Sequence, residues 1–361
     1  MFQSLSGFWD RIQGSLFPFL EKELGSLTKK QRQLVSIFEL IRIEEHLYPL
    51  PRGVGRPQKD RIALARSFVA KSLYNMNTTR VLIERLHADI PLRRLCGWEE
   101  RSQIPCESTF SRAFENFATS EFPKLVHTAL IKNVYKDQII VHISRDATAI
   151  NGREKFKRKK TKTKVVVKKK RLDCQLEMSQ AERLEDLPKK CNVGAKANSR
   201  GRRTFWEGYK CHLDVGDRDI PISCVITSAS VHDSQVAIPL ASETNSKVIS
   251  CYDLMDSAYD CPQIIQHIKN LGHVPIVVKN ARSKPVKEQI QEEKKALRNL
   301  NWKFPEEVRR QQRSSVERVN SRLKESFGGR AIQVRGYRKV YCHLMFGILA
   351  LTAQAILNSL Q

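Results

Sequence analysis

Apolar residues in the first third of the chain recur every three or four positions, which is the spacing of an amphipathic helix. Residues 29–48 show this spacing clearly, with apolar side chains at Leu34, Ile37, Phe38, Ile41 and Ile43. The same spacing returns at residues 62–73 and 78–90, and a basic linker that contains Pro and Gly lies at 51–61. The pattern predicts a helical N-terminal domain at residues 1–135.

A further helix is expected within residues 104–117, and Ser108 is its candidate N-cap. Three aromatic residues share one face of this helix: Phe110, Phe114 and Phe117. Two short helices separated by a turn are compatible with a helix-turn-helix, in which Ser111 and Arg112 would point toward a DNA groove. Aromatic residues at this spacing are also typical of a helix face buried in a core. Both interpretations stay open at this point.

The pattern changes to that of β-strands after residue 135. An apolar run at residues 138–150 predicts a buried strand. Four further strands are predicted at 204–215, 220–227, 248–254 and 273–278, and helices at 234–243 and 262–271. Three strands in a meander, followed by a helix, a strand, a helix and a strand, indicate a mixed α/β fold for residues 136–361.

Two aspartates stand at the ends of predicted strands. Asp146 lies where the apolar pattern of the first strand breaks. A carboxylate in such a place is costly unless it is solvated, paired or bound to a cation. Asp256 follows the strand at 248–254 and precedes small residues that allow a ligand to approach closely. Asp253 is the alternative for this second position.

A third acidic residue lies on a helix predicted at residues 311–328. The apolar stripe of this helix comprises Val316, Val319, Leu323 and Phe327. Glu317 lies at the edge of the stripe, between core and surface, where it can join the two strand-end aspartates. The alternative is an exposed ion pair between Arg313 and Glu317, which would stabilise the helix by roughly a few tenths of a kcal/mol.

His232 and Asp233 close the third predicted strand. Asp233 either caps the helix at residues 234–243 or lies near the same acidic centre.

The charge of the chain indicates a polyanionic partner. The 361 residues include 63 Lys and Arg against 38 Asp and Glu, a formal net charge of +25. Nucleic acid is the first partner to consider, and an anionic membrane surface is the alternative. The nine cysteines include no CxxC pair, which argues against a disulfide scaffold or a zinc ribbon and favours a reducing compartment.

Much of this charge is concentrated at residues 153–171, which carry twelve Lys or Arg and one Glu. Such a segment is either a flexible, solvated loop or an insertion that contacts DNA phosphates. The candidate DNA contacts in it are Arg153, Lys157, Arg158, Lys159 and Lys160.

The most apolar window of the chain lies at residues 340–357. Tyr341, His343 and Gln354 interrupt it, so it is expected to be a buried core helix and not a membrane span. The first 24 residues lack the basic region and the cleavage site of a secretory signal. We therefore expect no membrane partner.

Taken together, the acidic segments resemble those of bacterial insertion-sequence transposases of the DDE class. The segments are SRDATAI around Asp146, VHDSQVAIPL and DLMDSAYD before and around Asp256, and RSSVERVNSRLKESFGGR around Glu317. The family pattern is Tyr, two residues, Arg, three residues, the catalytic Glu, six residues and Lys. This sequence supplies Arg313, Glu317 and Lys324, but has Arg310 where the Tyr is expected.

The second family motif, Asp-x-Gly-Tyr, reads Asp256-Ser-Ala258-Tyr259 here, which favours Asp256 over Asp253. The resemblance implies an RNase H-like catalytic core, a mixed five-stranded sheet flanked by helices, at residues 136–361. A basic insertion at 151–203 would interrupt this core. The N-terminal domain at 1–135 would bind DNA or mediate dimerisation.

The resemblance also implies the chemistry. Asp146, Asp256 and Glu317 would hold two Mg²⁺ or Mn²⁺ ions, with Asp146 bridging them. Water would cut at the ends of the element, and the freed 3′ hydroxyl would attack target DNA. Arg313 and Lys324 would hold DNA phosphates, and a homodimer would pair the two ends in the cytoplasm of a bacterium, at the nucleoid. The alternatives are a metal-dependent nuclease of the same fold and a non-catalytic DNA-binding protein from a decayed element.

Overall fold

The computed structural model describes residues 12–47, 59–156, 170–197, 202–279, 284–299 and 305–360. The chain forms two compact units. The first comprises Met1–Asp137, Asn151–Glu154 and Ser321–Gln361, and the second comprises Gln138–Ile150 and Lys155–Asn320. The C-terminal segment therefore groups with the N-terminal helices. The division of the chain into domains at 1–135 and 136–361 stays a prediction.

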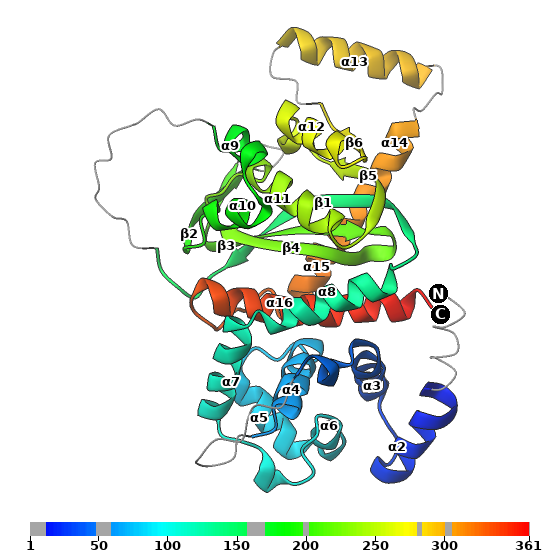
Figure 1. Ribbon diagram of the computed structural model, residues 1–361, viewed down its shortest axis with the longest axis vertical. Coiled ribbons are helices and arrows are strands. Elements are labelled where there is room, and N and C mark those ends of the chain that lie inside the picture. Colours follow the sequence, from blue (N-terminus) through cyan, green and yellow to red (C-terminus); the bar gives the residue numbers. More distant parts are fainter. Residues whose placement is uncertain are drawn as a thin grey trace. The chain divides into compact units, whose positions relative to one another are not determined.

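The first unit is helical (Figure 1). Its elements are η1 (Ile12–Leu16), α2 (Phe17–Leu24), α3 (Lys29–Ile41), η2 (Ile43–His46), α4 (Arg61–Leu73), α5 (Thr79–Ala88), α6 (Ile90–Leu95), η3 (Arg101–Gln103), α7 (Glu107–Thr119), α8 (Phe122–Val134) and α16 (Tyr337–Asn358). The predicted helices at 62–73 and 78–90 are confirmed as α4 and α5. The helix predicted at 29–48 is α3, which ends earlier because Arg42 adopts a left-handed conformation (φ 42°).

The core of this unit surrounds α16. Seventeen of the residues of α16 are buried, and the helix packs against α3, α4, α7 and α8. It is long and apolar enough to cross a membrane, but 94% of its most apolar window is buried inside the protein. The prediction of a buried core helix at 340–357 is thus confirmed.

The aromatic face of α7 belongs to this core. Phe110, Phe114 and Phe117 are buried and surround the ring of Phe68, with ring centroids 5.0–6.2 Å apart. The core interpretation of these residues is therefore confirmed. The predicted N-cap is wrong, because α7 begins at Glu107 and Cys106 occupies the N-cap position, without a side-chain hydrogen bond.

Close packing within the first unit requires glycine at one position of α16. A Cβ atom at Gly347 would lie 2.5 Å from the carbonyl oxygen of Phe327, just after helix α15 (Ser314–Ser326). The backbones of the two segments approach too closely there for any side chain.

A six-stranded mixed sheet forms the centre of the second unit. Its strands are β1 (Ile139–Asn151), β2 (Asn192–Ala197), β3 (Arg203–Gly216), β4 (Ile220–Ser228), β5 (Ile249–Met255) and β6 (Val274–Val277). The order is β2-β3-β1-β5-β6, and β4 pairs with β3. Strands β1, β5 and β6 are parallel, whereas β2, β3 and β4 are antiparallel.

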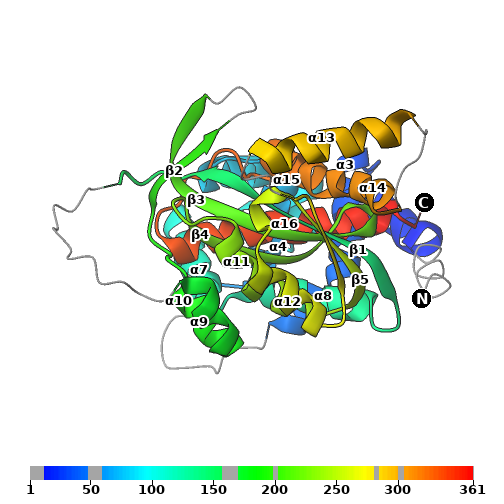
Figure 2. The same ribbon diagram turned by 90° about the horizontal axis from the view of Figure 1, so that it is seen from above.

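All five predicted strands are present, but the prediction of a five-stranded sheet missed β2. With β3 it forms a two-stranded ribbon (Figure 2). Its sequence, NVGAKA, is poor in the branched and aromatic residues that favour strands. Gly194 occurs there because a Cβ atom would lie 2.4 Å from the ring of Trp206.

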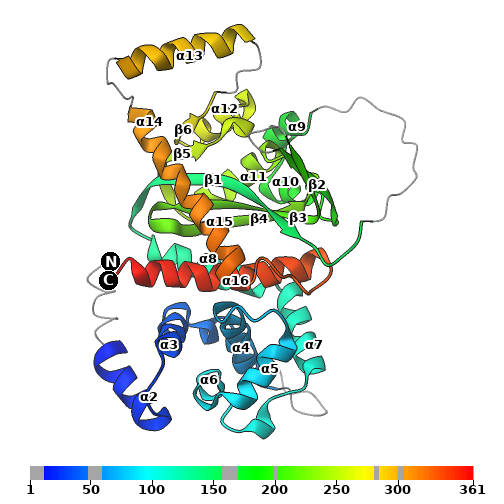
Figure 3. The same cartoon turned by 180° about the vertical axis from the view of Figure 1, so that it is seen from behind.

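Helices cover both faces of the sheet (Figures 1 and 3). One face is covered by α9 (Arg171–Glu177), α10 (Gln180–Asp186), α11 (Ser234–Asn245) and α12 (Pro262–Asn270). On the other lie α14 (Pro305–Arg310), η6 (Gln311–Arg313) and the beginning of α15. The remaining elements of this unit are α13 (Lys284–Asn299), η4 (Asp217–Asp219) and η5 (Ser257–Tyr259). The prediction of a mixed α/β fold with a helical N-terminal region is confirmed.

Strand β1 is only half-buried. Ile140 and Ile143 lie in the core, whereas Ile139 and Val141 are exposed. The predicted strand is present, but its predicted burial holds for one face only, because successive side chains of a strand point to opposite faces.

Candidate active site

The sheet brings Asp146 and Asp256 to the same level on neighbouring strands. In the parallel pair of β1 and β5, Ser144 lies opposite Leu254. Asp146 and Asp256 each follow two residues later, and Asp256 is the first residue after β5. Side chains at matching positions of parallel strands point to the same face. The two carboxylates therefore lie together, as the sequence predicts.

Asp146 carries an electrostatically unfavourable charge. The pKa of Asp146 is raised from 3.8 to about 6, chiefly by burial and in smaller part by the negative charge of Asp256. A hydrogen bond from the backbone of Ala147 and the positive charges of Lys196 and Arg313 oppose this effect without cancelling it. Two neighbouring carboxylates in this environment favour the binding of a cation.

Asp253 is part of a buried network instead. The fully buried guanidinium of Arg145 donates to both carboxylate oxygens of Asp214, at 2.8 and 2.7 Å, and to Asp253 at 3.1 Å. His273 also lies 3.0 Å from Asp253. Since Asp253 is 1% exposed and paired on both sides, the geometry favours Asp256 as the second carboxylate of the site.

Glu317 forms an ion pair with Arg313. This pair was the alternative to a place for Glu317 in the acidic site. Its Oε1 lies 2.5 Å from a guanidinium nitrogen of Arg313, and its side chain is 53% exposed. Arg313 also lowers the pKa of Asp146, so its charge acts on both acids. Among the described residues, the structure does not bring Glu317 into one group with Asp146 and Asp256.

Asn320, one helical turn after Glu317, connects α15 to Asp146. Its amide nitrogen donates to Asp146 Oδ2 at 3.4 Å, and its buried Oδ1 has no hydrogen-bond partner in the described part of the chain. The hydroxyl of Ser144, on β1, donates to the carbonyl of Gln312 at 3.2 Å, which fixes the start of this helix against the strand. The sequence analysis did not identify Asn320. Asn320 follows Glu317 by three residues, and residues at this spacing are neighbours on a helix surface, so the spacing could have indicated Asn320 in the sequence.

A buried tyrosine lies near the same acids. Tyr259 is 1% exposed, and its hydroxyl has no hydrogen-bond partner among the described residues. Burial raises the pKa of Tyr259 well above its ordinary value, and the charges of Asp233, Asp146 and Asp256 add to this effect. The hydroxyl therefore stays protonated and available as a hydrogen-bond donor.

Asp233 does not cap α11 with its side chain, so that interpretation was wrong. It instead accepts a hydrogen bond from the ammonium of Lys210, on β3, at 2.8 Å. Lys210 also donates to the carbonyl of Val231 at 2.8 Å. Because the charge of Asp233 acts on Tyr259, this ion pair belongs to the surroundings of the candidate site.

We considered whether these residues fit a divalent ion. In the described part of the chain, no three His, Cys, Asp or Glu side chains are grouped closely enough to hold a metal. Asp146 and Asp256 nevertheless supply the oxygen ligands that Mg²⁺ and Mn²⁺ prefer. The unpartnered Asn320 Oδ1 and Tyr259 hydroxyl are suited to hydrogen-bond water around such an ion. The chemistry of these groups fits a hard cation.

The predicted DNA-binding residues lie in different parts of the chain. Arg313 is next to the acids, and Lys324 is on α15, seven residues after Glu317. Arg153 donates to the carbonyl of Gln333 at 2.9 Å in the first unit. Arg112 is exposed on α7, where it donates to the Thr109 hydroxyl at 3.3 Å. The other four lie outside the described residues: Lys157, Arg158, Lys159 and Lys160.

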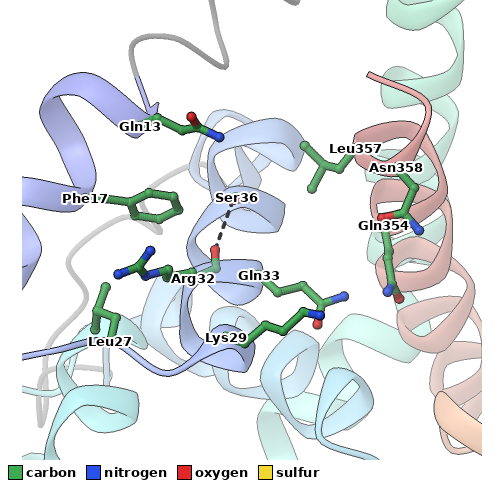
Figure 4. Close-up of a pocket in the computed structure, with 10 residues that line it drawn as sticks. All are labelled: Gln13, Phe17, Leu27, Lys29, Arg32, Gln33, Ser36, Gln354, Leu357 and Asn358. Carbon is green, nitrogen blue, oxygen red and sulfur yellow. Dashed lines mark hydrogen bonds between the residues drawn. The ribbon is translucent and has the colours of Figure 1, made fainter. Parts of the chain in front are cut away.

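A cavity of about 610 Å³ in the first unit is lined by residues of η1, α2, α3 and α16 (Figure 4). Arg32 in its wall pairs with Glu21 at 2.5 Å. None of the described residues that line it is a predicted catalytic or DNA-binding residue. The cavity therefore has no part in the candidate active site.

Comparison with known protein families agrees with the fold. Residues 140–353 match the family model described as the transposase DDE domain, and residues 21–116 match a second model, the transposase domain DUF772. No curated protein and no solved structure matches the chain. The first match contains Asp146, Asp256 and Glu317 and spans more than half of the sequence. The chain therefore belongs to the transposase DDE domain family, as an insertion-sequence transposase with an RNase H-like fold.

Proposed function

We propose that this transposase cuts DNA at the ends of an insertion sequence and joins the cut ends to target DNA. The observation that carries the proposal is the pair of Asp146 and Asp256 at the same level on parallel strands. Asn320 contacts Asp146 from α15, the helix that bears Glu317, and the charge of Arg313, at the end of η6, acts on Asp146. Ligand sites in sheets of this kind commonly lie at the carboxyl ends of the strands.

The family generally uses divalent metal ions. We assign Asp146, Asp256 and Glu317 as the residues that would hold two Mg²⁺ or Mn²⁺ ions. Such ions, when bound, activate the attacking oxygen and stabilise the leaving oxygen of a phosphodiester. Because Glu317 pairs with Arg313 in this structure, ion binding at Glu317 would compete with that pair.

The protein's own side chains would orient the reaction. Asn320 donates to Oδ2 of Asp146 through its amide nitrogen, which would leave Oδ1 of Asp146 to bind an ion. Arg313, released from Glu317, would hold a DNA phosphate next to the acids. The Tyr259 hydroxyl would donate a hydrogen bond to water or to substrate oxygen, because it remains protonated.

Further DNA contacts would come from basic residues outside this centre. We assign this role to Lys324, Arg112 and Arg153, and to the four basic residues Lys157, Arg158, Lys159 and Lys160. The N-terminal domain at 1–135 would recognise the terminal repeats. Since two DNA ends must be paired, we propose a homodimer, acting in the bacterial cytoplasm.

The proposal can be tested with a duplex that carries the inverted repeats bordering the coding sequence, a supercoiled target plasmid and Mg²⁺ or Mn²⁺. Transposition predicts cut ends and covalent joining of those ends to the plasmid. Cutting without joining would identify a nuclease of the same fold. Binding without cutting would identify a non-catalytic DNA-binding protein. Either of these results would refute the proposed function.

A further inference from the structure

We propose that a cavity in the first unit binds a phosphodiester group of DNA through the buried ammonium of Lys71. The cavity measures about 550 Å³ and is lined by residues of α4, α5, α7 and α16, and of the segment at 333–335. The proposal deepens the proposed function, because it assigns a DNA contact of the N-terminal region to a defined site.

The central observation is a buried positive charge without a partner. Lys71 on α4 is 8% exposed, and it makes no hydrogen bond or ion pair within the part of the chain that the structure describes. An isolated buried ammonium is unfavourable, since it has lost its hydration without gaining a compensating group. Burial accordingly lowers the pKa of Lys71 to about 8. A ligand that enters the cavity with a negative charge would supply the missing partner.

The walls of the cavity are partly aromatic. Three aromatic rings line it, those of Phe68, Phe114 and Phe346. His343 lies beside them, and burial and the charge of Lys71 lower its pKa to about 4. The neutral imidazole donates from Nε2 to the carbonyl of Gly328 at 2.9 Å. Because this histidine is neutral and its Nε2 is engaged, Lys71 is the charged group among the buried residues that line the cavity.

The rim of the cavity adds further positive charge. Arg80, Arg153, Arg335 and Lys339 line it, against a single acid, Glu107. Lys339 is paired with Glu115, and Arg80 lies 3.7 Å from Glu107. Arg335 is exposed and makes no ion pair with a described acid. The excess of cations suits an anion that reaches inward from the surface.

Helix α5 begins at the same rim. Thr78 is its N-cap, and its hydroxyl accepts a hydrogen bond from the backbone of Val81 at 3.1 Å. Thr79 and Arg80, the first two helical residues, line the cavity. Their backbone N–H groups have no acceptor within the helix. The start of a helix attracts phosphate, so the start of α5 and the ammonium of Lys71 both favour a phosphate ligand in this cavity.

Several features identify the anion as a phosphodiester of the DNA backbone. The site offers an ammonium, guanidinium groups and backbone amides, which are the donors that commonly contact phosphate. The chain belongs to a family of transposases, and the polyanion that transposases bind is DNA. A contact of this kind would fix the position of the DNA on the first unit without reading its sequence.

The first experiment compares wild type with Lys71→Met and Lys132→Met. Met fills the space of the lysine stem without its charge, and Lys132, exposed on α8, is the matched control. Thermal unfolding is followed in sodium phosphate and in sodium chloride of equal ionic strength. Phosphate stabilises folded proteins in general, so we expect it to raise the melting temperature of wild type and of Lys132→Met by more than that of Lys71→Met. Equal melting temperatures of wild type in the two salts would overturn the anion site without relying on any variant.

The second experiment identifies the source of the phosphate. A terminal-repeat duplex is prepared with single methylphosphonate substitutions, and binding is measured in EDTA so that no cleavage occurs. We expect one substitution to weaken binding by wild type about tenfold and to have no further effect on Lys71→Met. If inorganic phosphate binds but no methylphosphonate position depends on Lys71, the DNA assignment is overturned. Because neither experiment requires catalysis, failure of DNA cutting and joining would leave this inference standing.

Discussion

Replacing Asp146 should stabilise the protein in the absence of divalent ions. The folded-state pKa of Asp146, about 6, lies above its ordinary value of 3.8. Folding therefore disfavours the charged form of Asp146. As a result, the free energy of unfolding falls as the pH rises from 3.8 to about 6. The difference between the two pKa values, at 1.36 kcal/mol for each unit, corresponds to a loss of about 3 kcal/mol of folding stability at neutral pH. Asp146→Asn removes the charge and keeps an oxygen that can accept from Asn320.

We would measure urea unfolding of wild type and Asp146→Asn in EDTA, from acid to neutral pH. The variant should be more stable by about 2–3 kcal/mol above pH 6 and should approach wild type only below about pH 3, since the wild-type carboxyl is then protonated in both the folded and the unfolded state. Glu185→Gln, an exposed substitution on α10, is the control and should change little at any pH. Equal stability of Asp146→Asn and wild type at neutral pH would refute the idea that Asp146 carries an unfavourable charge.

Four other substitutions test separate parts of the structure. Asn320→Ala should lower the cleavage rate about tenfold or more and weaken the dependence on Mg²⁺, because Asp146 loses its orienting partner; unchanged metal dependence in a cleavage assay would contradict this role. Arg145→Met should destabilise the protein by about 3–5 kcal/mol in urea unfolding, since it leaves Asp214 and Asp253 buried without their cation. Gly347→Val should destabilise the first unit by about 1–3 kcal/mol because its side chain would collide with the backbone at Phe327, whereas Gly14→Ala, where nothing lies within 4 Å, should have little effect in the same measurement. Replacing Lys157, Arg158, Lys159 and Lys160 by Gln should reduce the slope of log affinity against log salt by as much as about 3–4; an unchanged slope would show that the segment does not contact DNA.

The elements with strong apolar patterns were predictable from the sequence. The five predicted strands and the buried helix at 340–357 carry enough apolar residues for burial to determine their structure. Strand β2 was missed because its pairing with β3 supplies the stability that its own residues lack. Tertiary contacts also explain the misplaced N-cap of α7. The packing of its phenylalanines, and not a capping side chain, determines where that helix lies.

The acids of the site were identified from motif and order, but their partners depend on tertiary structure. The apolar pattern predicted that Asp146 and Asp256 both lie at strand ends. Asp256 does follow β5, but the prediction was wrong for Asp146, because β1 continues to Asn151 through pairing that the sequence pattern does not show. The register of β1 and β5 places the two acids together. Asp253 could be separated from Asp256 only once Arg145 and His273 were seen to pair with it. Asn320 is an ordinary polar residue in the sequence, and its role becomes visible only through its contact with Asp146.

The central claim concerns the three acids, and we would test it by measuring strand cleavage and joining by Asp146→Asn, Asp256→Asn and Glu317→Gln beside wild type. Glu306→Gln, an exposed substitution on α14, is the control. With Mg²⁺ or Mn²⁺ and DNA that carries the element's own ends, wild type and the control should cut and join. Each of the three variants should bind this DNA and do neither. Near-normal cleavage by any one of the three variants would contradict the assignment of that acid to the active site.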